Sequence, residues 1–211
     1  MFHPTRWNAD LTSEEHSVLD GLTDPDRIQC FLDETPYSDE PIYRCPRSVL
    51  RDRKAHCFDG ACLAALALLR LGHRPLLVDL RAHRDDDHVL AVYRRDGAWG
   101  CVSKSNVALL RYREPIFRSL RELVMSFFEF YYNLDYEKSL REYSPPIDLR
   151  RFDALDWPLR DAAMDAIAER LDRVAHRPLL TPTQLAGLRR MDQRSYDAGL
   201  LGANWAGLYK P

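Results

Sequence analysis

The chain has 211 residues, a formal net charge of −2 and 45% hydrophobic residues. This length suits one domain of generous size, or one domain with an appended subdomain, and it is sufficient to bury a core without disulfides or metal. The near-neutral charge argues against a nucleic-acid-binding protein, which carries a basic excess, and no apolar run is long enough for a membrane span.

Cysteine usage and the first residues of the chain both favour a reducing compartment. The chain has five cysteines, an odd number, and no two of them form a C-x-x-C pair. Residues 1–11 lack the apolar core of a secretory signal peptide. We therefore expect reduced thiols in a cytoplasmic protein.

The first quarter of the chain predicts short helices and one loop. Residues 11–22 predict a helix with Thr12 or Ser13 as its cap and acidic side chains in its first turn. Residues 23–34 predict a second helix, which Asp24 or Thr23 would cap and in which Pro25 occupies the first turn. Residues 35–46 contain three prolines and therefore predict a loop. Residues 47–54 predict one or two helical turns.

A central buried helix is predicted over residues 57–71. This segment is rich in alanine and leucine, it is apolar on nearly all sides, and Gly72 follows it as a helix-ending residue. Cys62 within this helix is expected to be a core residue. The same is expected of Cys30 and Cys101, since cysteine is among the most buried residue types.

A small antiparallel sheet is predicted next. Residues 75–82, 88–95 and 98–105 form the expected strands, and the Asp96-Gly97 pair between the last two is a strong signal for a two-residue hairpin turn. Helices, then one central helix, then a small antiparallel sheet and further helices make up an α+β fold.

The second half of the chain predicts three helices and an extended linker. Residues 119–133 carry an aromatic stripe at helical spacing, which indicates a helix packed on the core. Residues 144–158 predict the linker. Residues 158–176 and 181–200 predict amphipathic helices.

Basic residues lead directly to Cys57 at the head of the central helix. Residues 41–56 contain five Arg or Lys against one Asp, a local charge of +4. A cysteine attacks as its thiolate, and its pKa falls near cations and helix N-termini. The sequence therefore predicts a lowered pKa at Cys57, and the free N–H groups of the first helical turn could hold an oxyanion. The basic or potentially basic neighbours are Arg51, Arg53, Lys54 and His56.

His88, at the start of a predicted strand, is the candidate base for such a nucleophile. With a two-residue turn, Ser105 lies opposite His88 and Ser103 is its diagonal neighbour. Either hydroxyl could orient the imidazole, and Asn106 could do so if a bulge turns it to the same face. Asp85, Asp86 and Asp87 offer a carboxylate instead.

A metal site is the alternative interpretation of the same region. Residues 83–88 contain two histidines and three aspartates, but their spacing matches no familiar ligand pattern. We therefore predict no metal and no cofactor.

Several of these features occur together, in order and spacing, over residues 46–107. A cysteine opens a buried helix, a strand follows, a histidine opens the next strand, and a tryptophan stands in the last one. This pattern resembles the transglutaminase-like core, which is related to papain, and the segment is similar to a bacterial branch of that superfamily. The matching residues are Cys57, Ala61, Leu68, Leu69, Arg70, Gly72, His88 and Trp99.

The resemblance implies a central helix packed on a small antiparallel sheet, and the flanking helices have no part in it. We predict that helices before and after this core wrap around it, with a transglutaminase-like domain over residues 1–145 and a C-terminal helical extension over residues 146–211 that packs on the same domain. In that family an acid stands four residues after the tryptophan, whereas this chain has Ser103 there. A serine cannot stabilise an imidazolium as a carboxylate does.

Together, the residues and the resemblance predict cysteine-dependent acyl transfer at a peptide or amide bond, of the protease, amidase or transglutaminase type. Cys57 and His88 are the expected catalytic pair, and Ser103, or Ser105 or Asn106 in its place, is the expected orienting residue. The expected partner is a peptide or amide substrate, proteins included, with no nucleic acid and no membrane; the sequence leaves the oligomeric state open. The alternative is a non-catalytic binding module that retains the fold.

Overall fold

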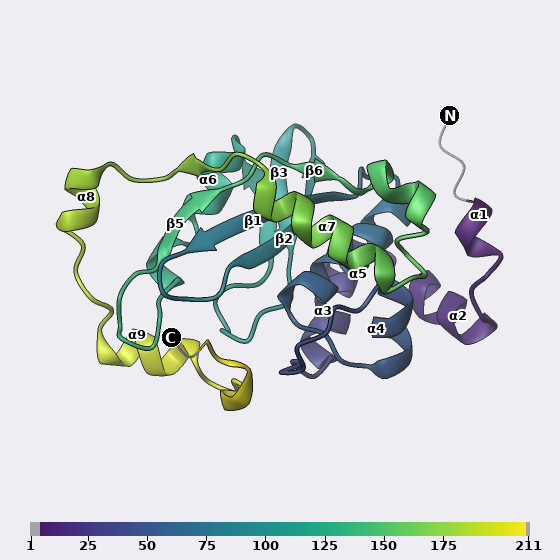
Figure 1. The fold of residues 1–211 in the computed structure, drawn as a ribbon, viewed down its shortest axis with the longest axis horizontal. Helices are drawn as coiled ribbons and strands as arrows, with labels where there is room; N and C mark the ends of the chain where they lie inside the picture. The colour runs from purple at the N-terminus through teal and green to yellow at the C-terminus, as the bar shows by residue number, and fades with distance from the viewer. Residues whose placement is uncertain (1–4, 210–211) are drawn as a thin grey trace.

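The computed structural model describes residues 5–209. Its centre is a mixed α+β arrangement in which one antiparallel sheet of seven strands carries helices on both faces (Figure 1). The strands follow the order β4 (Arg113–Phe117), β3 (Ala98–Val102), β2 (His88–Arg95), β1 (Leu76–Ala82), β5 (Leu140–Tyr143) and β7 (Arg177–Pro178), and β6 (Ile147–Asp148) also pairs with β1.

The first helices gather around the central helix at one end of the sheet (Figure 1). Thr12 caps the second helix and Asp24 the third, as the sequence predicts. The α-helices are α1 (Thr5–Asn8), α2 (Ser13–Gly21), α3 (Pro25–Glu34), α4 (Pro46–Asp52), α5 (Cys57–Arg70), α6 (Leu120–Met125), α7 (Ala162–Arg173), α8 (Pro182–Ala186) and α9 (Gln193–Gly199). Three 3₁₀ helices are η1 (Phe128–Phe130), η2 (Leu149–Leu155) and η3 (Trp205–Gly207).

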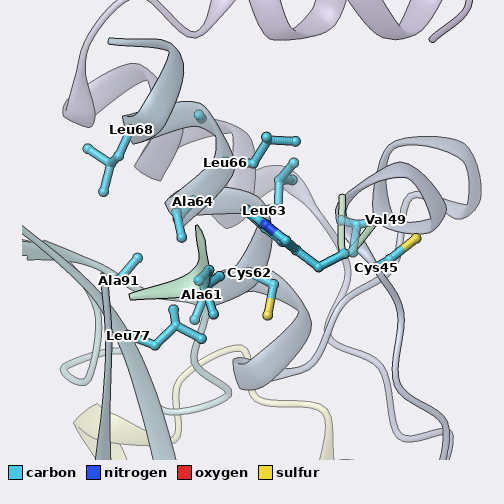
Figure 2. Close-up of a cluster of buried hydrophobic side chains, with 14 of the residues drawn as sticks. Cys45, Val49, Ala61, Cys62, Leu63, Ala64, Leu66, Leu68, Leu77 and Ala91 are labelled. Atoms are coloured by element: carbon cyan, nitrogen blue, oxygen red, sulfur yellow. The ribbon is translucent and has the colours of Figure 1, made fainter. Parts of the chain in front are cut away.

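Helix α5 is the buried centre of the fold, as predicted. Every residue from 58 to 68 is buried. The helix lies between Leu77 and Ala91 of the sheet on one side and Cys45 and Val49 at α4 on the other (Figure 2). Because α5 is apolar on all sides, it is stable only where other elements cover all of its faces. This packing determines where Cys57, the first residue of α5, lies.

The strands of the sheet alternate between two cores, as the period of two requires. Val89 and Ala91 of β2 belong to the core around α5. Leu90 and Val92 belong to a second core on the other face, which α6 covers. His88 lies on the same face of β2 as Leu90, so its side chain projects away from the body of α5.

The β2–β3 hairpin confirms the predicted turn and register. Asp96 and Gly97 have positive φ angles of 51° and 82°, and Arg95 pairs with Ala98. Pairing continues to Ala91 and Val102 and stops there. Beyond Val102 the chain leaves the sheet, so the strand predicted over residues 98–105 is too long and Ser105 does not pair with His88. The segment after Val102 instead covers His88, which is buried.

Two predicted helices are wrong in extent. Residues 119–133 form α6 only as far as Met125. A short 3₁₀ helix, η1, follows over Phe128–Phe130, and Phe127, Phe128 and Tyr131 are buried in the second core. Residues 181–200 form two short helices, because the N–H of Met191 donates to the Tyr136 carbonyl (2.8 Å) between them.

The sequence also missed four short strands, of which β4 pairs with β3 at one edge of the sheet. The segment predicted as a linker contains β6 and η2, and β5 and β7 form the far edge of the sheet. The residues after 145 thus add strands to the same sheet, and α7 adds Met164, Ile167 and Leu171 to the core around α5. The division at residue 145 stays a prediction.

Three of the five cysteines are buried, Cys57 is partly exposed and Cys30 is exposed. Cys62 and Cys101 lie in the core as predicted, whereas Cys30 is exposed because Ile28 and Leu32 form the buried face of α3. Across residues 5–209, none of the helices combines the length and the apolar character needed to cross a membrane.

Gly60 of α5 offers a test of this packing. A Cβ at this position would overlap the Cβ of Lys104, whose ammonium group is buried and donates to the Leu32 carbonyl (2.8 Å). We expect Gly60→Ala to lower the free energy of unfolding by about 2 kcal/mol, because overpacking a core typically costs 1–3 kcal/mol. Urea unfolding measures the change. Gly21→Ala is the matched control, since nothing lies within 4 Å of that Cβ, and it should be neutral or stabilising.

Candidate functional site

Buried Asp59 fixes the start of α5, where Cys57 stands. One oxygen of its carboxylate accepts a hydrogen bond from the His56 N–H (3.3 Å), and the other accepts from the Arg44 N–H (2.8 Å). The side chain is 0% exposed, and burial raises the pKa of Asp59 to about 7 although both bonds lower it. The carboxylate thus joins the helix start to the preceding loop, as half of a capping box does.

The Cys57 thiol is partly exposed and lies against the end of β2. Its Sγ is 3.7 Å from the Asp87 carbonyl oxygen. Burial, with smaller contributions from the carboxylates of Asp86 and Asp59, raises the pKa of Cys57 to about 12. The predicted lowering of this pKa is therefore wrong: in the resting protein Cys57 is a thiol at neutral pH.

The basic run before Cys57 fails to act on it because its charges are used elsewhere. His56 is largely buried, and burial lowers its pKa to about 4, so it is neutral rather than the cationic neighbour we expected. The others contact partners away from the thiol: Arg51 pairs with Asp52 (2.8 Å), Lys54 pairs with Glu40 (3.1 Å), and Arg53 lies 4.7 Å above the Phe31 ring.

His88 is held in one orientation through its Nε2. This nitrogen lies 2.9 Å from the Leu110 carbonyl oxygen and 3.3 Å from Ser103 Oγ. A carbonyl oxygen can only accept, so Nε2 carries the proton and Nδ1 carries the lone pair. The Ser103 hydroxyl donates to the same carbonyl (3.0 Å). The predicted diagonal contact between His88 and Ser103 exists, but a backbone carbonyl that the sequence could not indicate holds the imidazole more closely.

The free Nδ1 of His88 faces a small pocket that Cys57 also lines. Within residues 5–209, His88 Nδ1 makes no hydrogen bond. The single fully buried side-chain nitrogen or oxygen without a partner in that range is Arg170 Nε. His88 Nδ1 is therefore not fully buried and borders open space. That space is a pocket of about 60 Å³ lined by both residues. Burial lowers the pKa of His88 to about 4, so the imidazole is neutral. No direct hydrogen bond joins it to Cys57 within the same residues.

Tyr37 stands at the mouth of this pocket and of a larger cavity of about 420 Å³, and both are also lined by Cys57. Burial raises the pKa of Tyr37, so the hydroxyl keeps its proton. No sequence pattern indicated this tyrosine, which lies in a segment predicted as a loop.

The other two candidates for the orienting residue have different contacts. Ser105 Oγ accepts a hydrogen bond from the Val107 N–H (3.0 Å). Asn106 holds the backbone of Asn204 at both polar groups, donating to its carbonyl and accepting from its N–H, each at 2.8 Å. This clamp places residues 206–209 along the wall of the larger cavity.

The three consecutive aspartates before His88 mainly shape their own loop. Asp85 accepts a hydrogen bond from the Ser139 hydroxyl (2.6 Å), and Asp87 accepts from the Ala82 N–H (2.8 Å). Burial raises the pKa of Asp85 to about 7 and that of Asp87 to about 6. Within the described part of the chain, no three His, Cys, Asp or Glu side chains are grouped so that they could hold a metal ion.

Comparison with known proteins adds nothing to this geometry: no protein-family model and no curated protein matches the chain.

The raised pKa of Cys57 predicts slow labelling. Its alkylation by iodoacetamide should increase throughout the alkaline range without a plateau below about pH 10, because the thiolate is the reacting species. Peptide mass spectrometry follows each cysteine separately, with exposed Cys30 as the internal reference. A midpoint at or below about 8.5, the value of an ordinary thiol, would show that burial does not control this group.

The Asn106 clamp predicts a second effect on labelling. Asn106→Ala removes both hydrogen bonds to Asn204 and should speed the alkylation of Cys57 several-fold, because residues 206–209 then leave the cavity wall. Buried Cys62 must stay unlabelled if the effect is local. Asn8→Ala, which loses only an amide contact to Arg70 (2.9 Å), is the control, and an equal increase in that variant would contradict a role for the clamp.

Proposed function

We propose that the protein catalyses cysteine-dependent acyl transfer at a peptide or amide bond, on a transglutaminase-like core. Cys57 is the nucleophile and His88 the base. The observation that carries the proposal is the orientation of His88: the Leu110 carbonyl fixes the proton on Nε2 and leaves Nδ1 as an acceptor in the pocket that Cys57 lines.

Both reacting groups begin neutral, so the proton moves during the attack. As Sγ bonds to the substrate carbonyl carbon, its proton passes to His88 Nδ1. The imidazolium then gives this proton to the leaving amine as the carbon–nitrogen bond breaks. Water or a second amine attacks the resulting thioester and releases the acyl group. No step requires a cofactor.

Two groups support the charges that develop. Tyr37 and Cys57 both line the cavity, where the tyrosine hydroxyl or the Cys57 N–H could donate to the oxyanion. On the imidazolium side, the Leu110 carbonyl and Ser103 Oγ act in place of a carboxylate. Neutral oxygens stabilise a cation less than a carboxylate does, so we expect a slower reaction than a carboxylate would allow.

A non-catalytic binding module is the second candidate. The raised pKa of Cys57 and the neutral partners of His88 favour it. It differs from the enzyme in one respect that can be measured: a binding module forms no acyl-cysteine.

The state of the cysteines bears on the cellular compartment in which the reaction would take place. All five cysteines are free, which supports the proposed cytoplasmic location. The proposed substrate is a peptide or an amide, including those of proteins.

The proposal predicts acylation of Cys57 by p-nitrophenyl acetate. The sulfur takes the acetyl group and p-nitrophenolate leaves, so absorbance reports the rate and peptide mass locates the acetyl group. Cys57→Ala should abolish this reaction, and His88→Gln should slow it about a hundredfold, the lower end of typical general-base contributions. Ser103→Ala should cost less than about tenfold, because the Leu110 carbonyl still accepts from Nε2.

Cys30→Ala is the control for a thiol that reacts merely because it is exposed, and circular dichroism shows whether each variant is folded. If folded His88→Gln is acetylated at Cys57 at the same rate as the unmodified protein, His88 is not the base. No acetylation of Cys57 in the unmodified protein would favour the binding module.

A further inference from the structure

A segment of the chain itself, residues 204–209, lies beside the proposed nucleophile. Gly207, Leu208 and Tyr209 line both the larger cavity of about 420 Å³ and the small pocket of about 60 Å³. Cys57 also lines both, so these three residues and the thiol lie where the two cavities meet. We call residues 204–209 the strap.

The start of the strap is held by residues that line the small pocket. Asn106 holds the backbone of Asn204 through its two hydrogen bonds of 2.8 Å. Asn204 Nδ2 in turn donates to the Tyr37 carbonyl (3.2 Å), and Asn204 Oδ1 accepts from the Ala206 N–H (3.1 Å). Because Asn106 and Tyr37 both line that pocket, the walls of the site itself bind the strap.

The middle of the strap fits the site through one glycine and one apolar side chain. A Cβ on Gly207 would lie 3.1 Å from the Tyr37 ring, closer than most Cβ contacts, so the backbone comes this near only because glycine has no side chain. Leu208 packs against an apolar cluster that contains Tyr132 and Leu200, and both of these also line the small pocket.

This is how proteins bind an extended peptide. Hydrogen bonds to the main chain give affinity, and contacts with successive side chains give specificity. The strap has both kinds of contact, and it lies beside the cysteine that would attack a peptide carbonyl. The larger cavity adds a volume within the range of ligand pockets.

We propose that the strap occupies the site of a peptide substrate and inhibits the enzyme until it leaves. The inference rests on the proposed function where it calls the occupant a substrate. It narrows the substrate class to extended peptides in which a glycine lies against Tyr37 and an apolar residue follows directly. A tethered segment competes at an effective concentration on the order of millimolar, so the intact strap excludes a weakly binding free peptide.

Titration calorimetry with a free copy of the strap tests the proposal without requiring catalysis. The probe is the acetylated and amidated hexapeptide Asn-Trp-Ala-Gly-Leu-Tyr, which has the sequence of residues 204–209, and every protein carries Cys57→Ala to prevent reaction. The variant Asn204→Ala/Gly207→Val weakens the strap but leaves Asn106 and Tyr37 in place for the probe. We expect it to bind the probe at least about tenfold more tightly than the protein with the intact strap, because the tethered competitor is released.

A second probe and a matched variant make the test specific. The hexapeptide with valine in place of its glycine should bind the strap variant at least about tenfold more weakly, because the valine overlaps the Tyr37 ring. Asn8→Ala/Gly187→Val changes the same residue types where they line neither cavity, and it should bind no better than the protein with the intact strap. Circular dichroism shows whether each variant is folded, and the milder Gly207→Val should change the affinity in the same direction.

Two results overturn the proposal: equal affinity of the intact and the strap-variant proteins for the hexapeptide, or equal affinity of the strap variant for the two peptides. The p-nitrophenyl acetate reaction separates this failure from failure of the proposed function. Binding of the hexapeptide by a strap variant whose Cys57 that reagent does not acetylate would retain the peptide site and reject the enzyme. Acetylation of Cys57 without hexapeptide binding would do the reverse.

Discussion

The complete burial of α5 is the constraint on which the rest of the structure depends. A helix that is apolar on all sides is stable only between two covering layers, here the sheet and the N-terminal helices. With α5 packed in this way, its first residue, Cys57, lies at the end of β2, past the last residue pair between β2 and β3. Asp59 stabilises this position by joining the start of the helix to the loop at Arg44. Cys57 lies at the cavity because of this packing.

The second determinant is a backbone atom. The Leu110 carbonyl selects the tautomer of His88, and in doing so it decides which nitrogen can act on the thiol. With no carboxylate at Nε2 and with burial opposing charge on both groups, the resting state is a neutral thiol and a neutral imidazole. Under the proposed mechanism, such a pair would transfer a proton only when a substrate carbonyl accepts the sulfur.

The sequence predicted what short-range rules control. The spacing of apolar residues and Gly72 defined α5, and the Asp96-Gly97 turn defined the hairpin register, from which the contact of His88 with Ser103 follows. The sequence pattern could not predict β5, β6 and β7. These strands are two to four residues long, and they form because they pair with neighbouring strands that are distant in the sequence. Nor could it predict the role of Leu110, because a carbonyl leaves no trace in residue type.

The order of residues in the sequence was most misleading about the charges around Cys57. The basic residues adjacent to Cys57 in the chain point to other partners, while aspartates from β1, the following loop and α7 converge on the cavity. Burial contributes most to the raised pKa of Cys57, and the carboxylates of Asp86 and Asp59 add to it, so the surroundings of the thiol oppose the thiolate.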